Sequence, residues 1–256
     1  MRKPMMAGNW KMNNNWAESV VLAQQLSNRY DERWEDVEVV LCPPAIDIKA
    51  VYSVLEFDRR EEVVKVGGQN CHWEASGAFT GEISIPMLQA VGATHCIIGH
   101  SERRGYFGET DMDVNKKVKA LLAAHMTPIV CCGESLGVRD SGDYIEFITK
   151  QVSAAFAGLE PAEVKKCVVA YEPIWAIGTG RTATPEQAEE ACGAIRASIA
   201  EEFGADTADA IRILYGGSMK PANVEGLIAM EDIDGGLIGG AALKADDFVK
   251  LVEACL

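Results

Sequence analysis

Three apolar runs of this sequence are each followed by polar residues that could share one reaction site. The first run, Met5–Gly8, is followed by Asn9 and Lys11. Residues two apart in an extended segment point the same way, so the amide and the ammonium group can face one site. Lys11 would then supply a local positive charge for an anion, although a lysine in such a position is often only solvated.

A histidine follows the second run, His95–Ile98. We expect Ser101 to cap a helix at this point, which places His100 at the helix N-terminus. The helix dipole there disfavours a positive imidazole and favours the neutral ring, which can donate a hydrogen bond. His100 is the one histidine of four that follows a strand-like run, although a lone histidine is more often structural.

The third run, Cys167–Tyr171, ends at a carboxylate, Glu172. Pro173 fixes the following turn and Trp175 adds apolar cover, so Glu172 could be partly desolvated and more basic than usual. That is what a general base requires. The alternative is a carboxylate neutralised by a nearby basic residue.

Two kinds of glycine-rich segment complete the pattern. Residues 173–182 have an apolar centre between a proline and a glycine-rich end, which is typical of a lid that excludes water. Later in the chain, Ser218 follows one Gly-Gly pair, and Gly239 and Gly240 form a second. Glycines after strands let backbone N–H groups approach a ligand, and helix N-termini add partial positive charge, so these pairs indicate a phosphate site.

The elements that must position these residues alternate along the chain. Short, mostly continuous apolar runs are typical of parallel strands buried on both faces. The expected strands are Met5–Gly8, Val37–Leu41, Val63–Gly67, His95–Ile98, Thr127–Cys131, Cys167–Tyr171, Ile211–Tyr215 and Gly235–Ile238. The expected helices are Trp16–Tyr30, Ile46–Leu55, Ile85–Val91, Asp113–His125, Tyr144–Phe156, Glu186–Phe203, Asn223–Met230 and Ala245–Cys255.

Eight strands and eight helices in strict alternation favour the α/β class and a closed eight-stranded parallel barrel, (β/α)8, with about 32 residues per unit. A doubly wound sheet is the rival, but it has exposed edges and usually fewer strands. No linker or composition break divides the chain, so we expect a single barrel domain over residues 1–256. Reactive groups of such a barrel lie at the carboxyl ends of the strands.

Charge and composition exclude several classes of function. The 24 basic and 38 acidic side chains give a net charge of −14, which argues against a nucleic-acid or anionic-membrane partner but not against a small anion. No apolar segment has the pattern of a signal peptide or the length of a membrane span. The eight cysteines show no C-x-x-C spacing, so we expect reduced thiols and a cytoplasmic location.

Two motif matches fail on context. Gly133–Gly137 fits the hydrolase pattern G-x-S-x-G, but that triad needs a later histidine and none follows His125. Gly178–Ala183 fits a dinucleotide pattern, but it begins seven residues after its strand rather than in a tight turn. The few histidines are scattered, so we expect no bound metal.

The sequence resembles the triosephosphate isomerase family. The stretch YEPIWAIGTG at residues 171–180 is highly specific, and the other matching segments occur in family order along the whole chain. They are Ala7–Met12, Gly68–Glu74, Phe79–Ser84, Ile97–Arg104, Cys132–Glu134, Ala170–Thr184, Tyr215–Lys220 and Asp232–Ala241.

The resemblance implies interconversion of dihydroxyacetone phosphate and D-glyceraldehyde 3-phosphate in glycolysis and gluconeogenesis, with no cofactor and no metal. Position by position, it implies that Glu172 is the base and His100 the neutral electrophile. It also implies that Lys11 stabilises negative charge, that Asn9 positions the substrate and that Glu102 supports the site. The tuned glutamate–histidine pair and the closing lid are established features of that family.

By the same resemblance, Gly178, Ser218, Gly239 and Gly240 bind the phosphate group through backbone N–H groups. The long loop Asn70–Ser84 is implied to insert into a second subunit, giving a homodimer. Its length and exposed aromatics independently indicate a covered surface, with a self-packed loop as the alternative.

Small departures from the family pattern leave the chemistry unchanged. Ile174 and Arg181 stand where valine and lysine are common in the lid hinges, and both could alter lid kinetics. Cys71 and Cys131 are candidate sites of reaction with thiol reagents. A Schiff-base aldolase on the same fold would need a lysine where strand six has Glu172, and a catalytically silent barrel would be expected to lack some of the named groups.

Overall fold

Eight parallel strands close into a barrel in the computed structural model, which describes residues 2–176 and 182–256. Each strand pairs with its neighbour in the sequence, and β1 also pairs with β8, which closes the sheet. The expected (β/α)8 barrel is therefore confirmed, and the rival open sheet is excluded. The strands are β1 Met5–Asn9, β2 Glu38–Cys42, β3 Val64–Gly68, β4 His95–Ile98, β5 Thr127–Glu134, β6 Val168–Pro173, β7 Arg212–Tyr215 and β8 Gly235–Ile238.

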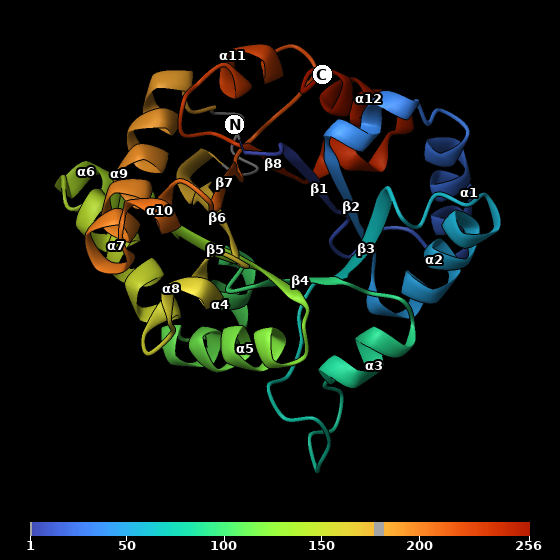
Figure 1. The fold of residues 1–256 in the computed structure, drawn as a ribbon, viewed down its shortest axis with the longest axis horizontal. Helices are drawn as coiled ribbons and strands as arrows, with labels where there is room; N and C mark the ends of the chain where they lie inside the picture. The colour runs from blue at the N-terminus through green and yellow to red at the C-terminus, as the bar shows by residue number, and fades with distance from the viewer. Residues whose placement is uncertain (1, 177–181) are drawn as a thin grey trace.

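Helices surround the barrel on all sides (Figure 1). All eight expected helices are present; Tyr144–Phe156 has the expected ends, and the ends of the others differ by at most three residues. They are α1 Trp16–Ser27, α2 Ile48–Phe57, α3 Ile85–Ala90, α5 Asp111–Ala123, α7 Tyr144–Phe156, α9 Pro185–Phe203, α11 Val224–Ile228 and α12 Ala245–Glu253.

Helices alternate with the strands as expected, but the expectation of a single helix in each connection is wrong, because several connections contain further short helices. The α-helical ones are α4 Ser101–Phe107, α6 Leu136–Ser141, α8 Pro161–Val164 and α10 Ala205–Ala208, and the 3-10 turns are η1 Glu32–Asp36, η2 Ala45–Asp47, η3 Ile174–Ala176 and η4 Gly240–Leu243. The added α-helices have only four to seven residues. Such lengths are too short to show a helical hydrophobic period.

The apolar strands are continuous because the barrel wall separates two cores. Along β1, Met5 and Ala7 belong to the cluster inside the barrel, while Met6 belongs to the cluster between barrel and helices. Both faces of each strand are thus removed from water, as in other parallel sheets. The wall holds the carboxyl ends of the strands in a fixed ring, and the functional residues project from that ring.

The loop between β3 and α3 extends away from the barrel (Figure 1). Its base is ordered by contacts of its own: His72 N–H donates to the carbonyl of Ile83 at 2.8 Å, and the His72 ring packs on Trp73 and Phe79 with centroid distances of 4.3 and 4.1 Å. Residues 74–82 at its tip are exposed. The loop is therefore internally packed at the base and uncovered at the tip.

None of the described helices is long and apolar enough to cross a membrane.

All eight cysteines lie among the described residues and are free thiols, and all except Cys255 are buried. Burial raises the pKa of the Cys131 thiol well above its usual value. The burial of Cys71 and Cys131 opposes the expected reactivity toward thiol reagents.

Candidate active site

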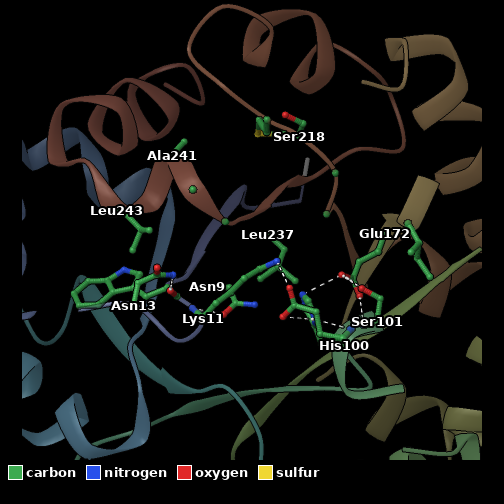
Figure 2. Close-up of a pocket in the computed structure, with 18 of the residues that line it drawn as sticks. Asn9, Lys11, Asn13, His100, Ser101, Glu172, Ser218, Leu237, Ala241 and Leu243 are labelled. Carbon is green, nitrogen blue, oxygen red and sulfur yellow. Dashed lines mark hydrogen bonds and ion pairs between the residues drawn. The ribbon is translucent and has the colours of Figure 1, made fainter. Parts of the chain in front are cut away.

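A cavity of about 1060 Å³ opens at the carboxyl ends of the strands and contains most of the predicted site residues. Asn9, Lys11, His100, Glu102 and Glu172 all line it. Figure 2 shows Lys11 extending across the cavity toward His100, with Glu172 beyond the histidine. The barrel thus brings together residues from β1, the β4–α4 junction and β6.

The end of β1 holds Lys11 in an uncommon backbone conformation. Its φ is 54°, in the left-handed region that non-glycine residues rarely adopt. Asn9 Oδ1 accepts the Lys11 N–H at 3.0 Å, and Gln69 Nε2 donates to the Lys11 carbonyl at 2.8 Å. The Lys11 ammonium lies 2.6 Å from Glu102 Oε1. Backbone restraint and ion pair together fix where the positive charge lies.

His100, rather than Ser101, is the N-cap residue of α4, so the expected cap is wrong by one position. The ring Nδ1 of His100 accepts the backbone N–H of Glu102 at 3.2 Å. An acceptor nitrogen carries no proton, so in the neutral ring the proton is on Nε2. Nε2 lies 3.0 Å from Glu172 Oε1. The hydrogen bond at the helix terminus therefore favours, for the neutral ring, the tautomer whose Nε2–H can donate into the cavity.

Glu172 is 1% exposed and is held by three donors. The Ser101 backbone N–H and hydroxyl each donate to it at 2.9 Å, and His100 Nε2 is the third. Burial raises the pKa of Glu172, but His100 and the two Ser101 donors together lower it below its ordinary value. The expected increase in basicity is therefore wrong for this resting arrangement, because the desolvated carboxylate is fully hydrogen-bonded.

Trp175, in the described part of the segment expected to form a lid, is held by a buried carboxylate that the sequence reasoning missed. Glu134 Oε1 accepts hydrogen bonds from Trp175 Nε1 at 2.8 Å and from the Tyr171 hydroxyl at 3.0 Å, and Arg139 lies 3.2 Å from the same oxygen. Trp175 was expected to cover Glu172, but its indole N–H is directed to Glu134. The signal was available, because Glu134 sits inside the rejected G-x-S-x-G segment as an acidic residue ending an apolar strand.

The expected phosphate-binding residues Ser218, Gly239 and Gly240 line the same cavity. A methyl group on Gly240 would meet nothing within 4 Å, and one on Gly239 would meet only the Lys11 side chain at 3.7 Å. Both backbones therefore face open space that a ligand can enter. Gly178 lies in residues 177–181, outside the described part of the chain, as does Arg181.

The first Gly-Gly pair has a different physical reason. A methyl group on Gly216 would lie 3.0 Å from Glu172 Cγ, and one on Gly217 would lie 2.2 Å from the Tyr215 hydroxyl. These glycines let the segment after β7 pack against Glu172 and its neighbours. Both pairs line the cavity, but only the second has room for a side-chain atom at its glycines.

Gln69 is a second residue that sequence reasoning missed. Its amide donates to the carbonyls of both Lys11 and Cys42, at 2.8 and 2.9 Å, and so ties the ends of β1 and β2 together. No spacing rule identifies such a contact, since the partner atoms belong to the backbone.

Among the described residues, no group of three or more histidine, cysteine, aspartate or glutamate side chains is arranged to hold a metal ion.

Fold and site define an α/β barrel in which a buried carboxylate, a buried histidine and an ammonium group line one cavity. The sequence profile of the triosephosphate isomerase family matches residues 4–255. The chain is 51% identical to the triosephosphate isomerase of Cytophaga hutchinsonii over 255 residues, covering 99% of this chain and all of that protein. It is 49% identical to that of Lactobacillus delbrueckii subsp. bulgaricus and 48% identical to that of Streptococcus pyogenes serotype M49, each over 252 residues and 98% of both chains.

This chain belongs to the triosephosphate isomerase family. It is an isomerase, as its resemblance to the family implied.

Proposed function

We propose that this enzyme interconverts dihydroxyacetone phosphate and D-glyceraldehyde 3-phosphate, with Glu172 as the base that moves the proton between the two carbons. The observation that carries the proposal is a buried glutamate whose carboxylate lies 3.0 Å from a histidine nitrogen that bears the proton. A carbon next to a carbonyl loses its proton only if a base takes it while an acid or cation stabilises the oxygen. Both groups line one cavity here.

The proton moves in three steps. Glu172 removes a proton from one substrate carbon, and the electron pair flows onto the neighbouring carbonyl oxygen to give an enediolate. His100 donates its Nε2 proton to that oxygen and takes a proton from the other oxygen, while Lys11 stabilises the negative charge. Glu172 then returns its proton to the second carbon, so no group is consumed.

The low pKa of Glu172 in the resting site has a direct consequence for this cycle. When the carboxylate turns from the Ser101 donors toward a substrate carbon, it loses two hydrogen bonds that stabilise its charge. Burial remains, and burial raises the pKa of Glu172. Substrate binding therefore makes the base stronger at the moment at which it is needed.

The remaining predicted residues position the substrate. Asn9 holds the backbone of Lys11, and Glu102 fixes its ammonium group. The N–H groups of Ser218, Gly239 and Gly240 bind the phosphate group, together with Gly178 of the lid. Exclusion of water by the lid protects the enediolate from loss of phosphate.

The proposal is tested by a coupled isomerisation assay in excess chelator on the wild type, Glu172→Asp and Glu202→Asp. Shortening the base by one methylene should lower kcat by at least ~10²-fold, because proton transfer depends on position. Glu202 is an exposed residue of α9, so the same change there should leave kcat unchanged. Activity that a chelator abolishes, or an unaffected Glu172→Asp, would contradict the mechanism.

We also propose that the enzyme is a homodimer in which loop Asn70–Ser84 of each subunit enters a cavity of the other. A second cavity of about 370 Å³ adjoins the active site and is lined by Lys11, His100, Glu102 and Phe107. Large apolar side chains are exposed around it, with Met12 97% and Phe107 71% exposed. Such a concentration of apolar surface is typical of an interface.

Sedimentation equilibrium tests the dimer. Phe79, 43% exposed near the loop tip, is expected to contact the partner, so Phe79→Asp should produce monomers and lower activity. Phe57, 87% exposed at the end of α2, provides a control, since Phe57→Asp should leave the dimer intact. A wild-type monomer would refute the arrangement.

We further propose that residues 1–256 form one barrel domain and that the eight free thiols reflect a cytoplasmic location.

A further inference from the structure

Arg104 is a charged residue near the catalytic cavity to which the proposed proton chemistry gives no part. Its side chain is 16% exposed, and it is not among the described residues that line the cavity. It belongs to the last turn of α4, the short helix that His100 caps. A charged side chain that is largely removed from water needs several partners, and the partners of Arg104 indicate what it does.

The guanidinium group of Arg104 joins two neighbouring strands beyond the end of their ladder. The pairing of β4 with β5 ends one residue before Gly99 and Cys131. Arg104 donates to the carbonyls of both residues, from Nε to Gly99 at 2.7 Å and from Nη2 to Cys131 at 3.3 Å. Its third nitrogen, Nη1, pairs with Asp111, the first residue of α5. One side chain thus connects the ends of both strands and the following helix.

The turn that leads into His100 lies directly against this group. Gly99 follows β4 and has a φ of 69°, in the left-handed region. A methyl group on Gly99 would lie 3.0 Å from Arg104 Nη2 and 3.1 Å from the Cys131 carbonyl oxygen. After the turn, the backbone N–H of Arg104 donates to the His100 carbonyl at 3.1 Å. Arg104 therefore holds both peptide groups that flank His100.

Burial of an apolar face does not fix α4, since none of its seven residues is buried. A helix of this length is also not stable by itself. Ser101 ties the helix to Glu172, but in the proposed reaction that contact is given up when the carboxylate turns to the substrate. The contacts of Arg104 are made to the barrel backbone and to α5, so they can persist throughout the reaction.

We propose that Arg104 is a positioning residue for the reaction, which keeps His100 Nε2 in place beside the substrate by holding the Gly99–His100 turn to β5. A misplacement of about 1 Å can cost about 10²-fold in rate. The planar fork of arginine can donate to two carbonyls and a carboxylate at once, whereas the ammonium group of a lysine ends a flexible stem and lacks that geometry. The inference rests on the proposed role of His100.

The test compares Arg104→Lys with a matched control, Arg196→Lys, in the coupled isomerisation assay at a temperature at which both variants are folded by circular dichroism. Arg196 is 10% exposed and also donates to two backbone carbonyls and pairs with aspartate, but it does so at the amino end of β7. Arg104→Lys should lower kcat about 10–100-fold, because His100 is displaced. KM should change little, because the residues expected to bind phosphate follow β7 and β8. Arg196→Lys should lower Tm and leave kcat unchanged.

Nitrogen NMR of the His100 ring separates positioning from stability. In the wild type without substrate, at a pH at which the ring is neutral, the ¹⁵N shifts should show a protonated Nε2 and an unprotonated Nδ1. In Arg104→Lys they should move toward a mixture of the two tautomers, because a displaced ring loses the hydrogen bond from the Glu102 N–H. A loss of stability alone would not change these shifts in the folded enzyme.

A second variant keeps the test decisive if Arg104→Lys does not fold. Asp111 is 43% exposed, so Asp111→Asn should fold and should shift kcat and the His100 signals in the same direction by a smaller amount. A kcat of the Arg104 variant equal to that of the wild type, an equal loss in Arg196→Lys, or unchanged His100 shifts would overturn the inference. If only Asp111→Asn folds, unchanged kcat and shifts in that variant would do so. The shifts need no substrate, so failure here is distinct from failure of the proposed reaction, which Glu172→Asp tests.

Discussion

Glu38 at the amino end of the barrel strands should control stability in acid. It begins β2, and its carboxylate lies 3.0 Å from His95 Nε2 on β4 and forms an ion pair with Arg212 on β7. Burial raises the pKa of Glu38, but the hydrogen bond from His95 and the charge of Arg212 lower it to about 2. Three strands are thus joined through one carboxylate, at the end of the barrel opposite the active site.

The sign of the effect follows from the lowered pKa. An unfolded glutamate titrates near 4.3, so ionised Glu38 stabilises the fold above that pH and the contribution is lost as the pH falls toward 2. Each pKa unit corresponds to about 1.4 kcal/mol, which gives an upper value of about 3 kcal/mol. The side chain is 23% exposed, and solvent screening reduces this to about 1–2 kcal/mol.

Urea unfolding of the wild type and Glu38→Gln between pH 2 and pH 5 measures this contribution. The variant should be about 1–2 kcal/mol less stable at pH 5, and the difference should shrink steadily toward pH 2. Glu62→Gln is the control, since that side chain is 88% exposed and should show little effect. A stability difference that stays constant over the whole range would refute the assignment of the low pKa to Glu38.

Two further predictions concern buried groups. Lys117 and Glu109 form an ion pair whose side chains are only 5% and 3% exposed. Lys117→Met should lower the free energy of unfolding by about 3 kcal/mol, because it leaves the Glu109 carboxylate with only Arg103 at 3.4 Å. Equal stability of wild type and variant would contradict this. Cys71 and Cys131 are fully buried. After treatment with an alkylating reagent, mass spectrometry should therefore find neither thiol labelled in the native enzyme and both labelled in urea. Rapid labelling of the native enzyme would contradict this and show that the barrel opens.

The sequence predicted the repeating parts of the fold because their signal is repetitive. His95–Ile98 and Gly235–Ile238 have the strand ends expected for them, and Tyr144–Phe156 is the expected helix. The period of an apolar face accumulates over such segments. For the helix Ser101–Phe107, only the N-terminus was predicted, without an end. Its N-cap was placed one residue late, because histidine is not among the usual N-cap residues.

The site was predictable in its residue types but not in its electrostatics. The sequence places Glu172 at the end of a buried strand, and burial alone predicts a raised pKa. The opposite direction arises from Ser101 and His100, which are 71 and 72 positions away in the chain and meet the carboxylate only after barrel closure. Glu134 shows the same limit, since its buried charge is explained only by the tyrosine, tryptophan and arginine that surround it.

Two charged side chains of the cavity, Lys11 and Glu172, are therefore paired with other protein groups. Lys11 is held by Glu102, and Glu172 by Ser101 and His100, so protein groups compensate both the ammonium group and the carboxylate. A substrate must replace these partners with its own carbonyl and hydroxyl groups. If the phosphate group binds at the β7–β8 edge as proposed, it supplies binding energy away from the reacting carbons, and that energy can offset the lost hydrogen bonds. A triose without phosphate should therefore react far more slowly even when it saturates the enzyme, because nothing would drive Glu172 from its resting donors.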